Sequence, residues 1–113
     1  MAELLEKGQI ILIEFPFKDA EEKKKRPALI IGIKNNNIIL AQITSINKEG
    51  IAFDSNDLEK GYMNKPSYIN PTNIITINKQ QTLGVCGYLK KTKYSEVTND
   101  IKRVLFDSDK NQK

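Results

Sequence analysis

The sequence contains no histidine and no tryptophan, and its single cysteine is Cys86. Because histidine is the commonest general acid or base and the commonest transition-metal ligand, catalysis by this chain must use other side chains. One cysteine excludes an internal disulfide framework, and without a second thiol or a histidine the chain cannot build a structural zinc site. We therefore expect a protein of a reducing compartment that uses neither a metal nor another cofactor.

Long apolar runs are also absent. No stretch approaches the roughly 20 apolar residues that cross a bilayer, and residues 1–7 lack the apolar centre of a signal peptide. The acidic residues form no calcium loop, since Asp54 and Asp57 are near one another but lack further oxygen ligands at regular spacing. We interpret this pair as part of a solvated turn. These absences predict a cytoplasmic protein that has no contact with a membrane.

The residues that are present fit one small domain. The 113 residues suffice for one core but not for two, and Ile, Leu and Val dominate the apolar residues. Two of these three side chains are β-branched, which favours a sheet. We predict a single domain over residues 1–106, followed by a flexible polar tail over residues 107–113.

Short apolar segments separated by turn residues predict five or six β-strands. These are residues 9–15, 27–33, 38–44, 51–53, 67–69 and 73–77. Asparagines at positions 35–37 predict a tight hairpin turn between the second and third strands. Because no helical segment separates the strands, the pattern favours a mainly β fold, a strongly bent antiparallel barrel closed by one helix. A two-layer α+β sandwich is the alternative.

The C-terminal segment has helical periodicity. Its apolar residues recur on one face of an α-helix, at Tyr94, Val97, Ile101, Val104 and Leu105. Thr92 or Ser95 is expected to cap the start of this helix. We expect the apolar face to pack on the sheet, because an amphipathic helix ordinarily buries such a stripe.

Two short basic runs, residues 23–26 and 90–93, accompany a net charge of +4. Such runs are typical of solvated loops, although they also suit a polyanionic partner. Arg26 lies where the charged loop re-enters the sheet, and Thr44 lies where the third strand ends. If these two strands form a hairpin, both side chains lie at the same open end. A guanidinium and a hydroxyl in that arrangement can contact one phosphate group.

The order of these segments resembles the MazF/PemK family, the toxins of bacterial toxin-antitoxin pairs. The resemblance is carried by Gly8-Gln9-Ile10-Ile11, by Phe15-Pro16-Phe17 with Asp19, and by Lys24-Lys25-Arg26-Pro27-Ala28-Leu29-Ile30. Later elements match in the same order at Thr44-Ser45, at Lys65-Pro66-Ser67-Tyr68, and at Ile74, Thr76 and Ile77. The Phe-Pro-Phe-x-Asp segment is most similar to the PemK-like branch.

The resemblance implies an SH3-like barrel of the MazF/CcdB type that forms a homodimer. It implies a metal-independent, sequence-selective endoribonuclease that cleaves single-stranded RNA through attack by the 2′-hydroxyl. It also implies a cognate antitoxin whose acidic segment occupies the RNA groove. In this family the matching arginine and threonine are catalytic, which designates Arg26 and Thr44. The RNA-binding residues that we expect are Lys24, Lys25, Phe17, Ser45 and Ser67.

Two departures from the family pattern prevent a transfer of RNA preference. Asp19 stands where the family commonly has glycine, and Ile75 stands where it often has a basic residue. Tyr62 and Tyr68 are able to stack on bases, but we interpret both as buried structural tyrosines. Two other functions stay open. One is a non-catalytic SH3-like module that binds RNA or protein, and the other is a CcdB-type gyrase poison, which depends on a C-terminal tryptophan that this sequence lacks.

Overall fold

The computed structural model describes residues 4–15, 24–46, 50–63 and 65–107. The strands and the long helix are β1 (Gln9–Phe15), β2 (Lys24–Lys34), β3 (Asn37–Thr44), β4 (Ile51–Phe53), β5 (Leu58–Gly61), β6 (Ser67–Asn78), β7 (Gly84–Leu89) and α1 (Lys91–Lys102). Short 3-10 helices follow β4 (Ser55–Asp57) and β6 (Lys79–Gln81), and a π-helical turn (Arg103–Asp107) follows α1.

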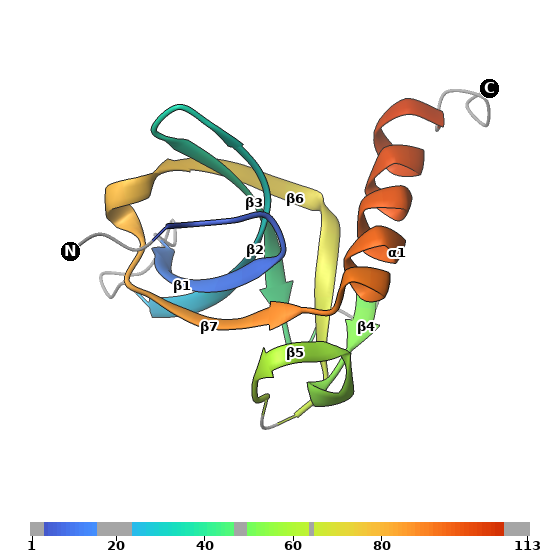
Figure 1. Ribbon diagram of the computed structural model, residues 1–113. Coiled ribbons are helices and arrows are strands. Elements are labelled where there is room, and N and C mark those ends of the chain that lie inside the picture. The colour runs from blue at the N-terminus through green and yellow to red at the C-terminus, as the bar shows by residue number, and fades with distance from the viewer. Residues whose placement is uncertain (1–3, 16–23, 47–49, 64, 108–113) are drawn as a thin grey trace.

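The seven strands form one curled sheet in the order β4-β6-β3-β2-β1-β7-β5. Every neighbouring pair is antiparallel. The sheet bends into a half-barrel, and α1 stands beside it (Figure 1). This architecture confirms the predicted antiparallel barrel with a C-terminal helix and leaves no place for the layered sandwich.

The central strands are apolar on both faces because the curled sheet buries both. Ile10 of β1 and Leu29 of β2 belong to one core cluster, whereas their chain neighbours Ile11 and Ala28 belong to another. Side chains alternate across a strand, so a run of consecutive apolar residues supplies both clusters at once. α1 adds buried Val97 to the first cluster. The near-continuous apolar run of β1 follows from this two-sided burial.

Several predicted boundaries are confirmed. β1 and β4 occupy the predicted ranges, and β2 and β3 extend them by a few residues. The hairpin between β2 and β3 turns through Asn35, whose φ of 57° lies in the left-handed region that asparagine tolerates. The helical prediction is also confirmed, with Val97 and Ile101 buried.

Three sheet predictions were wrong. Ser67–Asn78 is one strand, in which buried Pro71 is accommodated where the pairing with β3 shifts register between Ala41 and Gln42. β5 was missed because it is a short edge strand with mostly exposed side chains. β7 was missed because two of its six residues are glycines, which weaken the apolar pattern of a strand. A Cβ on Gly87 would lie 2.5 Å from the carbonyl oxygen of Lys60, so glycine there permits the close approach of β5.

The ends of α1 also differ from the prediction. The N-cap residue is Lys90, which makes no capping hydrogen bond with its side chain, and Thr92 and Ser95 lie inside the helix. Leu105 is exposed, because the chain leaves the α-helical repeat in the π-helical turn and rotates this residue away from the core. None of the helices in the described residues has the length and apolar content needed to cross a membrane.

Candidate functional site

Arg26 and Thr44 lie at the fork where β2 and β3 separate. The paired residues of these strands run from Ala28 opposite Gln42 towards the hairpin. If the same register is continued by two residues past this pair, Arg26 comes opposite Thr44, and both side chains fall on one face of the sheet. Pro27, which has no backbone N–H to donate, stands at the fork. The local sequence thus opens the hairpin at the two predicted catalytic residues.

A cavity of about 290 Å³ occupies the open end of this hairpin, and we call it the fork cavity. Five of the predicted residues line it: Lys25, Arg26, Thr44, Ser45 and Ser67. They come from the start of β2, the end of β3 and the start of β6. The structure therefore brings together residues that are up to 42 positions apart in the chain, from Lys25 to Ser67.

Two predicted residues are not placed in the cavity. Phe17 lies outside the residues that the structure describes. Of Lys24 only the backbone is described, at the first position of β2. Their expected contacts with RNA stay predictions.

The fork cavity combines cations with shielded hydroxyl groups. Its described lining includes Lys25, Arg26 and Lys65 and no acidic side chain. Thr44 and Ser67 are only 8% and 6% exposed. The Thr44 Oγ1 atom accepts a hydrogen bond from the backbone N–H of Ile46 at 3.3 Å. A hydroxyl that accepts one bond still has its own hydrogen to donate. The arrangement suits an anionic oxygen more than any other ligand atom.

Strand pairing fixes the two hydroxyl groups relative to one another. Thr44 is opposite Tyr68 in the β3–β6 ladder, and Ser67, the preceding residue of β6, is opposite Phe53 of β4. Both side chains are therefore mounted on the sheet rather than on loops. Rigid mounting of this kind keeps donors at fixed positions before a ligand arrives.

Sequence reasoning missed one wall of the cavity, formed by Met63 and Lys65. These residues follow β5 in a polar stretch that lacks a strand pattern. A signal was available, because Lys65 opens the Lys-Pro-Ser-Tyr element that was already recognised. Tyr62, next to Met63, is 73% exposed, so its interpretation as a buried residue was wrong, whereas Tyr68 is partly buried.

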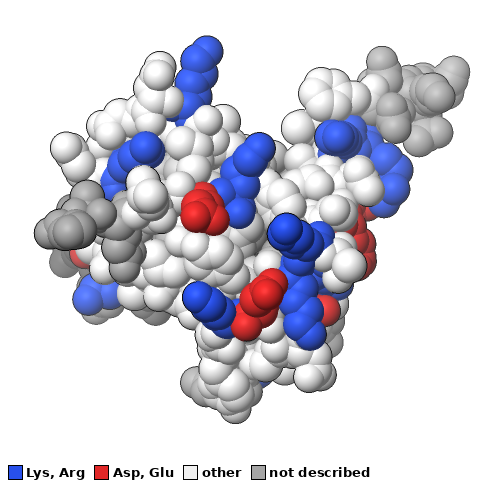
Figure 2. Space-filling model, in the orientation of Figure 1, with Lys and Arg blue, Asp and Glu red and all other residues white. Residues whose placement is uncertain are grey.

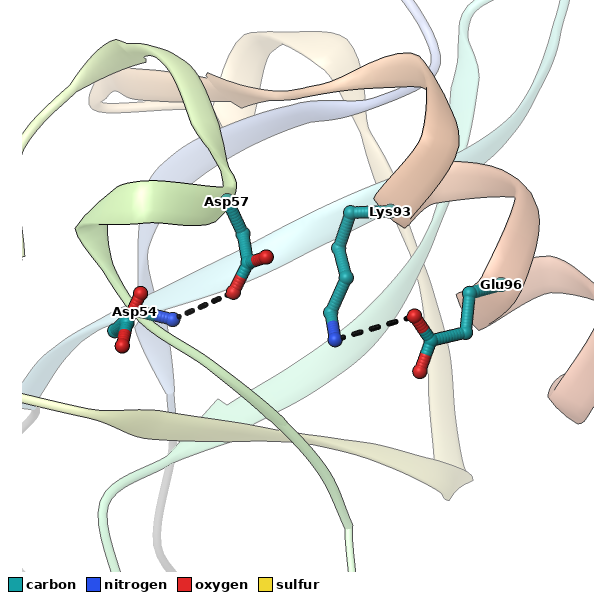
Figure 3. A network of polar contacts seen from close by, with 4 residues as sticks. All are labelled: Asp54, Asp57, Lys93 and Glu96. Carbon is teal, nitrogen blue, oxygen red and sulfur yellow. Dashed lines mark hydrogen bonds and ion pairs between the residues drawn. The ribbon is translucent and has the colours of Figure 1, made fainter.

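The acidic pair before this wall has a structural use. The Asp54 side chain accepts a hydrogen bond from Asn56 N at 2.9 Å, and Asp54 N donates one to Asp57 Oδ2 at 3.0 Å (Figure 3). The two carboxylates thus cap the 3-10 helix Ser55–Asp57 reciprocally. Lys93 and Glu96 form a separate ion pair on the nearby helix (Figure 3). In the described part of the chain, no three cysteine or acidic side chains gather in a group able to hold a metal ion.

Comparisons with known proteins bear on the family and the fold of the chain. The family described as "PemK-like, MazF-like toxin of type II toxin-antitoxin system" matches residues 6–105. The Mycobacterium tuberculosis toxin MazF-mt6 has a similar structure, with a TM-score of 0.66 and 21% identity over 86% of this chain and 95% of that one. An endoribonuclease in complex with its cognate antitoxin, from Mycobacterial species, gives a TM-score of 0.62 and 16% identity over 87% and 88%. At such identities the two structures show a shared fold. A search of curated proteins gave no match.

Proposed function

The chain belongs to the PemK-like, MazF-like toxins of type II toxin-antitoxin systems, and from this premise we propose that it is a sequence-selective endoribonuclease acting on single-stranded RNA. One observation carries the proposal. Arg26 and Thr44, which reach the site from different strands, line a single cavity whose described charged residues are all cations. The proposed nuclease is independent of metal ions.

The chemistry of RNA cleavage needs what these residues offer. When the 2′-oxygen attacks the adjacent phosphorus, negative charge grows on the phosphoryl oxygens and the 5′-oxygen leaves. We assign Arg26 to stabilise that charge through its planar pair of donors. The hydroxyl of Thr44 donates a hydrogen bond to a developing oxyanion. Guanidinium groups stay protonated and are poor bases, so Arg26 is not assigned the role of accepting the 2′-hydroxyl proton. In this proposal that proton passes to a water molecule, and another water molecule protonates the departing 5′-oxygen.

The remaining cavity residues would hold the RNA strand. Exposed Lys25 and Lys65 contact phosphates without reading sequence, while the Ser45 and Ser67 hydroxyls contact sugar or phosphate oxygens. The same cations suit an acidic protein segment, and one structural neighbour is an endoribonuclease in complex with its cognate antitoxin. We therefore propose that the antitoxin of this toxin covers the fork cavity. Homodimerisation is part of the same proposal.

The test uses purified protein and a mixed pool of single-stranded RNA in the presence of EDTA. We expect discrete fragments that end in 2′,3′-cyclic phosphate. An oligonucleotide with 2′-deoxyribose at a mapped cleavage position should stay intact, because it lacks the attacking oxygen.

Three results would count against the proposal. Retarded but uncut RNA would support the non-catalytic binding module instead. Cleavage of the 2′-deoxy substrate would show that the nucleophile is not the neighbouring hydroxyl. A metal-dependent reaction, abolished by EDTA and restored by Mg²⁺, would contradict the assignment of the chemistry to protein side chains alone.

A further inference from the structure

We propose that Tyr62 is a base-stacking residue for the RNA strand in the fork cavity. The inference rests on the proposed function and adds a subsite to it. Tyr62 directly precedes Met63, which lines the cavity. Neighbouring Cα atoms are about 3.8 Å apart, less than the length of a tyrosine side chain. Tyr62 is thus attached to the chain one residue away from the cavity wall, and the proposal places its ring against a nucleotide next to the one whose phosphate contacts Arg26.

The exposure of Tyr62 distinguishes it from the other tyrosines. Of the four in the chain, it is the one with an exposed side chain. The Tyr88 hydroxyl accepts a hydrogen bond from Gln9 Nε2 at 3.0 Å, and the Tyr94 hydroxyl donates one to the carbonyl oxygen of Ile31. These tyrosines have structural partners inside the fold. Tyr62 instead presents an aromatic surface to solvent beside a cavity, where a ligand can cover it.

The backbone on both sides of Tyr62 is fixed. Gly61 has a φ of 101°, and a Cβ there would overlap the carbonyl oxygen of Cys86. On the other side, Met63 N donates to Ser55 Oγ at 2.8 Å, and Ser55 Oγ donates to the Met63 carbonyl oxygen at 3.1 Å. Ser55 itself belongs to the 3-10 helix capped by Asp54 (Figure 3). Anchored neighbours limit the movement of the Tyr62 backbone, so less backbone freedom is lost when a base stacks on the ring.

The surroundings favour a nucleic acid over an apolar ligand. Lys25, Arg26 and Lys65 line the adjacent cavity. Grooves that bind single-stranded nucleic acids combine aromatic side chains with cations. The bases stack on the aromatic rings, and the phosphates of the nucleic acid contact the cations. Such stacking tolerates every base, so Tyr62 would add affinity at one nucleotide position more than sequence selectivity.

The experiment compares Tyr62→Ala, Tyr62→Phe and Tyr62→Leu with the matched control Phe106→Ala. Phe106 is 72% exposed and lies in the turn after α1, away from the residues that line the fork cavity. The probe is a synthetic single-stranded RNA that spans one cleavage site mapped in the EDTA digest. A 2′-deoxyribose at the cleaved position prevents turnover, and 2-aminopurine replaces a base adjacent to that position.

We expect Tyr62→Ala to raise the dissociation constant for this RNA by about 5- to 100-fold. The KM for the cleavable RNA should rise by a similar factor, with kcat changed less than about twofold. The 2-aminopurine fluorescence, quenched by the wild type through stacking, should stay unquenched in Tyr62→Ala. Tyr62→Phe should restore both affinity and quenching, Tyr62→Leu should restore neither, and Phe106→Ala should match the wild type.

The possible failures are distinguishable. If the wild type cleaves RNA and Tyr62→Ala binds and quenches as the wild type does, the stacking role is wrong and the nuclease proposal stands. If Tyr62→Leu performs as well as Tyr62→Phe, the residue provides apolar contact rather than stacking, and the inference fails. If the wild type cleaves no RNA in the pool, it is the nuclease proposal that fails. Circular dichroism of each variant excludes misfolding as the cause of a loss.

Discussion

The described residues line two cavities of similar volume that differ in the elements from which their polar groups come. The fork cavity measures about 290 Å³, and a second one, between α1 and the sheet, measures about 330 Å³. We call the second one the helix cavity. Its lining residues are Lys7, Ile31, Tyr94, Thr98, Ile101 and Lys102. Size alone therefore does not locate the site.

In the helix cavity the hydroxyl groups serve the fold. Tyr94 Oη donates to the Ile31 carbonyl oxygen at 3.4 Å, and Thr98 Oγ1 donates to the carbonyl oxygen of Ser95 at 3.2 Å. The apolar floor belongs to the core, since Ile101 is buried and Ile31 packs against the same cluster. This cavity is a seam between a helix and a sheet. In the fork cavity, by contrast, the polar groups come from the start of β2, the end of β3 and the start of β6, and residues at strand ends commonly serve a ligand.

Positive charge does not separate the two cavities either. The helix cavity also has two lysines at its rim, and Figure 2 shows basic side chains spread widely over the visible face rather than gathered at one place. Diffuse charge of this kind attracts polyanions without selecting a binding position. The difference lies in the pairing of cations with buried hydroxyl groups, which the fork cavity has at Thr44 and Ser67.

The largest expected difference between the cavities is catalytic. Arg26→Ala should lower the rate of RNA cleavage by about two to three orders of magnitude, the range found when one transition-state donor is removed. Lys102→Ala removes a cation from the helix cavity and should leave the rate within about twofold. Single-turnover cleavage of the mapped RNA measures both. Equal losses in the two variants would mean that Arg26 acts only through the general positive field of the protein.

The second difference concerns stability. Ile101→Ala should lower the free energy of unfolding by about 2–5 kcal/mol, because it removes buried methyl groups from the seam between α1 and the sheet. Leu105→Ala is the matched control, since this residue is exposed just beyond the same helix and its truncation should cost less than about 0.5 kcal/mol. Urea denaturation gives both values. If Leu105→Ala lowered the free energy of unfolding as much as Ile101→Ala does, Leu105 would have to be buried against a surface outside this chain.

The sequence was informative where local periodicity and tertiary burial agree. The limits of β1 and the buried residues Val97 and Ile101 followed from hydrophobic spacing alone. β7 could not be found in this way, because Gly87 is required by the close approach of β5, a contact between segments distant in the chain. The edge strand β5 has one buried residue, Leu58, which leaves almost no apolar pattern to detect.

In the candidate site, too, local features were predictable, whereas contacts between separate segments were not. Arg26 and Thr44 were identified from strand ends and a family motif, and a hairpin necessarily brings such ends together. The position of Met63 was not predictable, because it depends on Ser55, whose hydroxyl holds the Met63 backbone from eight residues away. A polar stretch between strands gives no sign in the sequence of such hydrogen bonds.

A smaller difference between the two cavities is expected in the salt dependence of RNA binding. Lys65→Ala should reduce the magnitude of the slope of log K against log salt for single-stranded RNA by about 0.7, the value for one lost phosphate contact. Lys102→Ala should leave the slope unchanged. Fluorescence anisotropy of the uncleavable RNA at several salt concentrations measures the slopes. The same decrease for Lys102→Ala would place RNA across the helix cavity as well.

The smallest expected effect belongs to Tyr94, whose hydroxyl lies in the helix cavity. Tyr94→Phe removes one long hydrogen bond and should lower the free energy of unfolding by about 0.5–1 kcal/mol near neutral pH, with RNA cleavage unchanged. Burial raises the pKa of the Tyr94 phenol above its ordinary value. The folded state therefore favours the protonated phenol more than the unfolded state does.

This preference makes the stability of the wild type depend on alkaline pH. The contribution is complete below the unfolded-state pKa of about 10, and it is lost as pH rises from there through the higher folded-state value. Tyr94→Phe cannot ionise at this position, so its stability should fall less than that of the wild type between about pH 9 and 11. Urea denaturation across this range provides the comparison. Parallel curves would mean that the phenol is as well solvated in the folded chain as in the unfolded one.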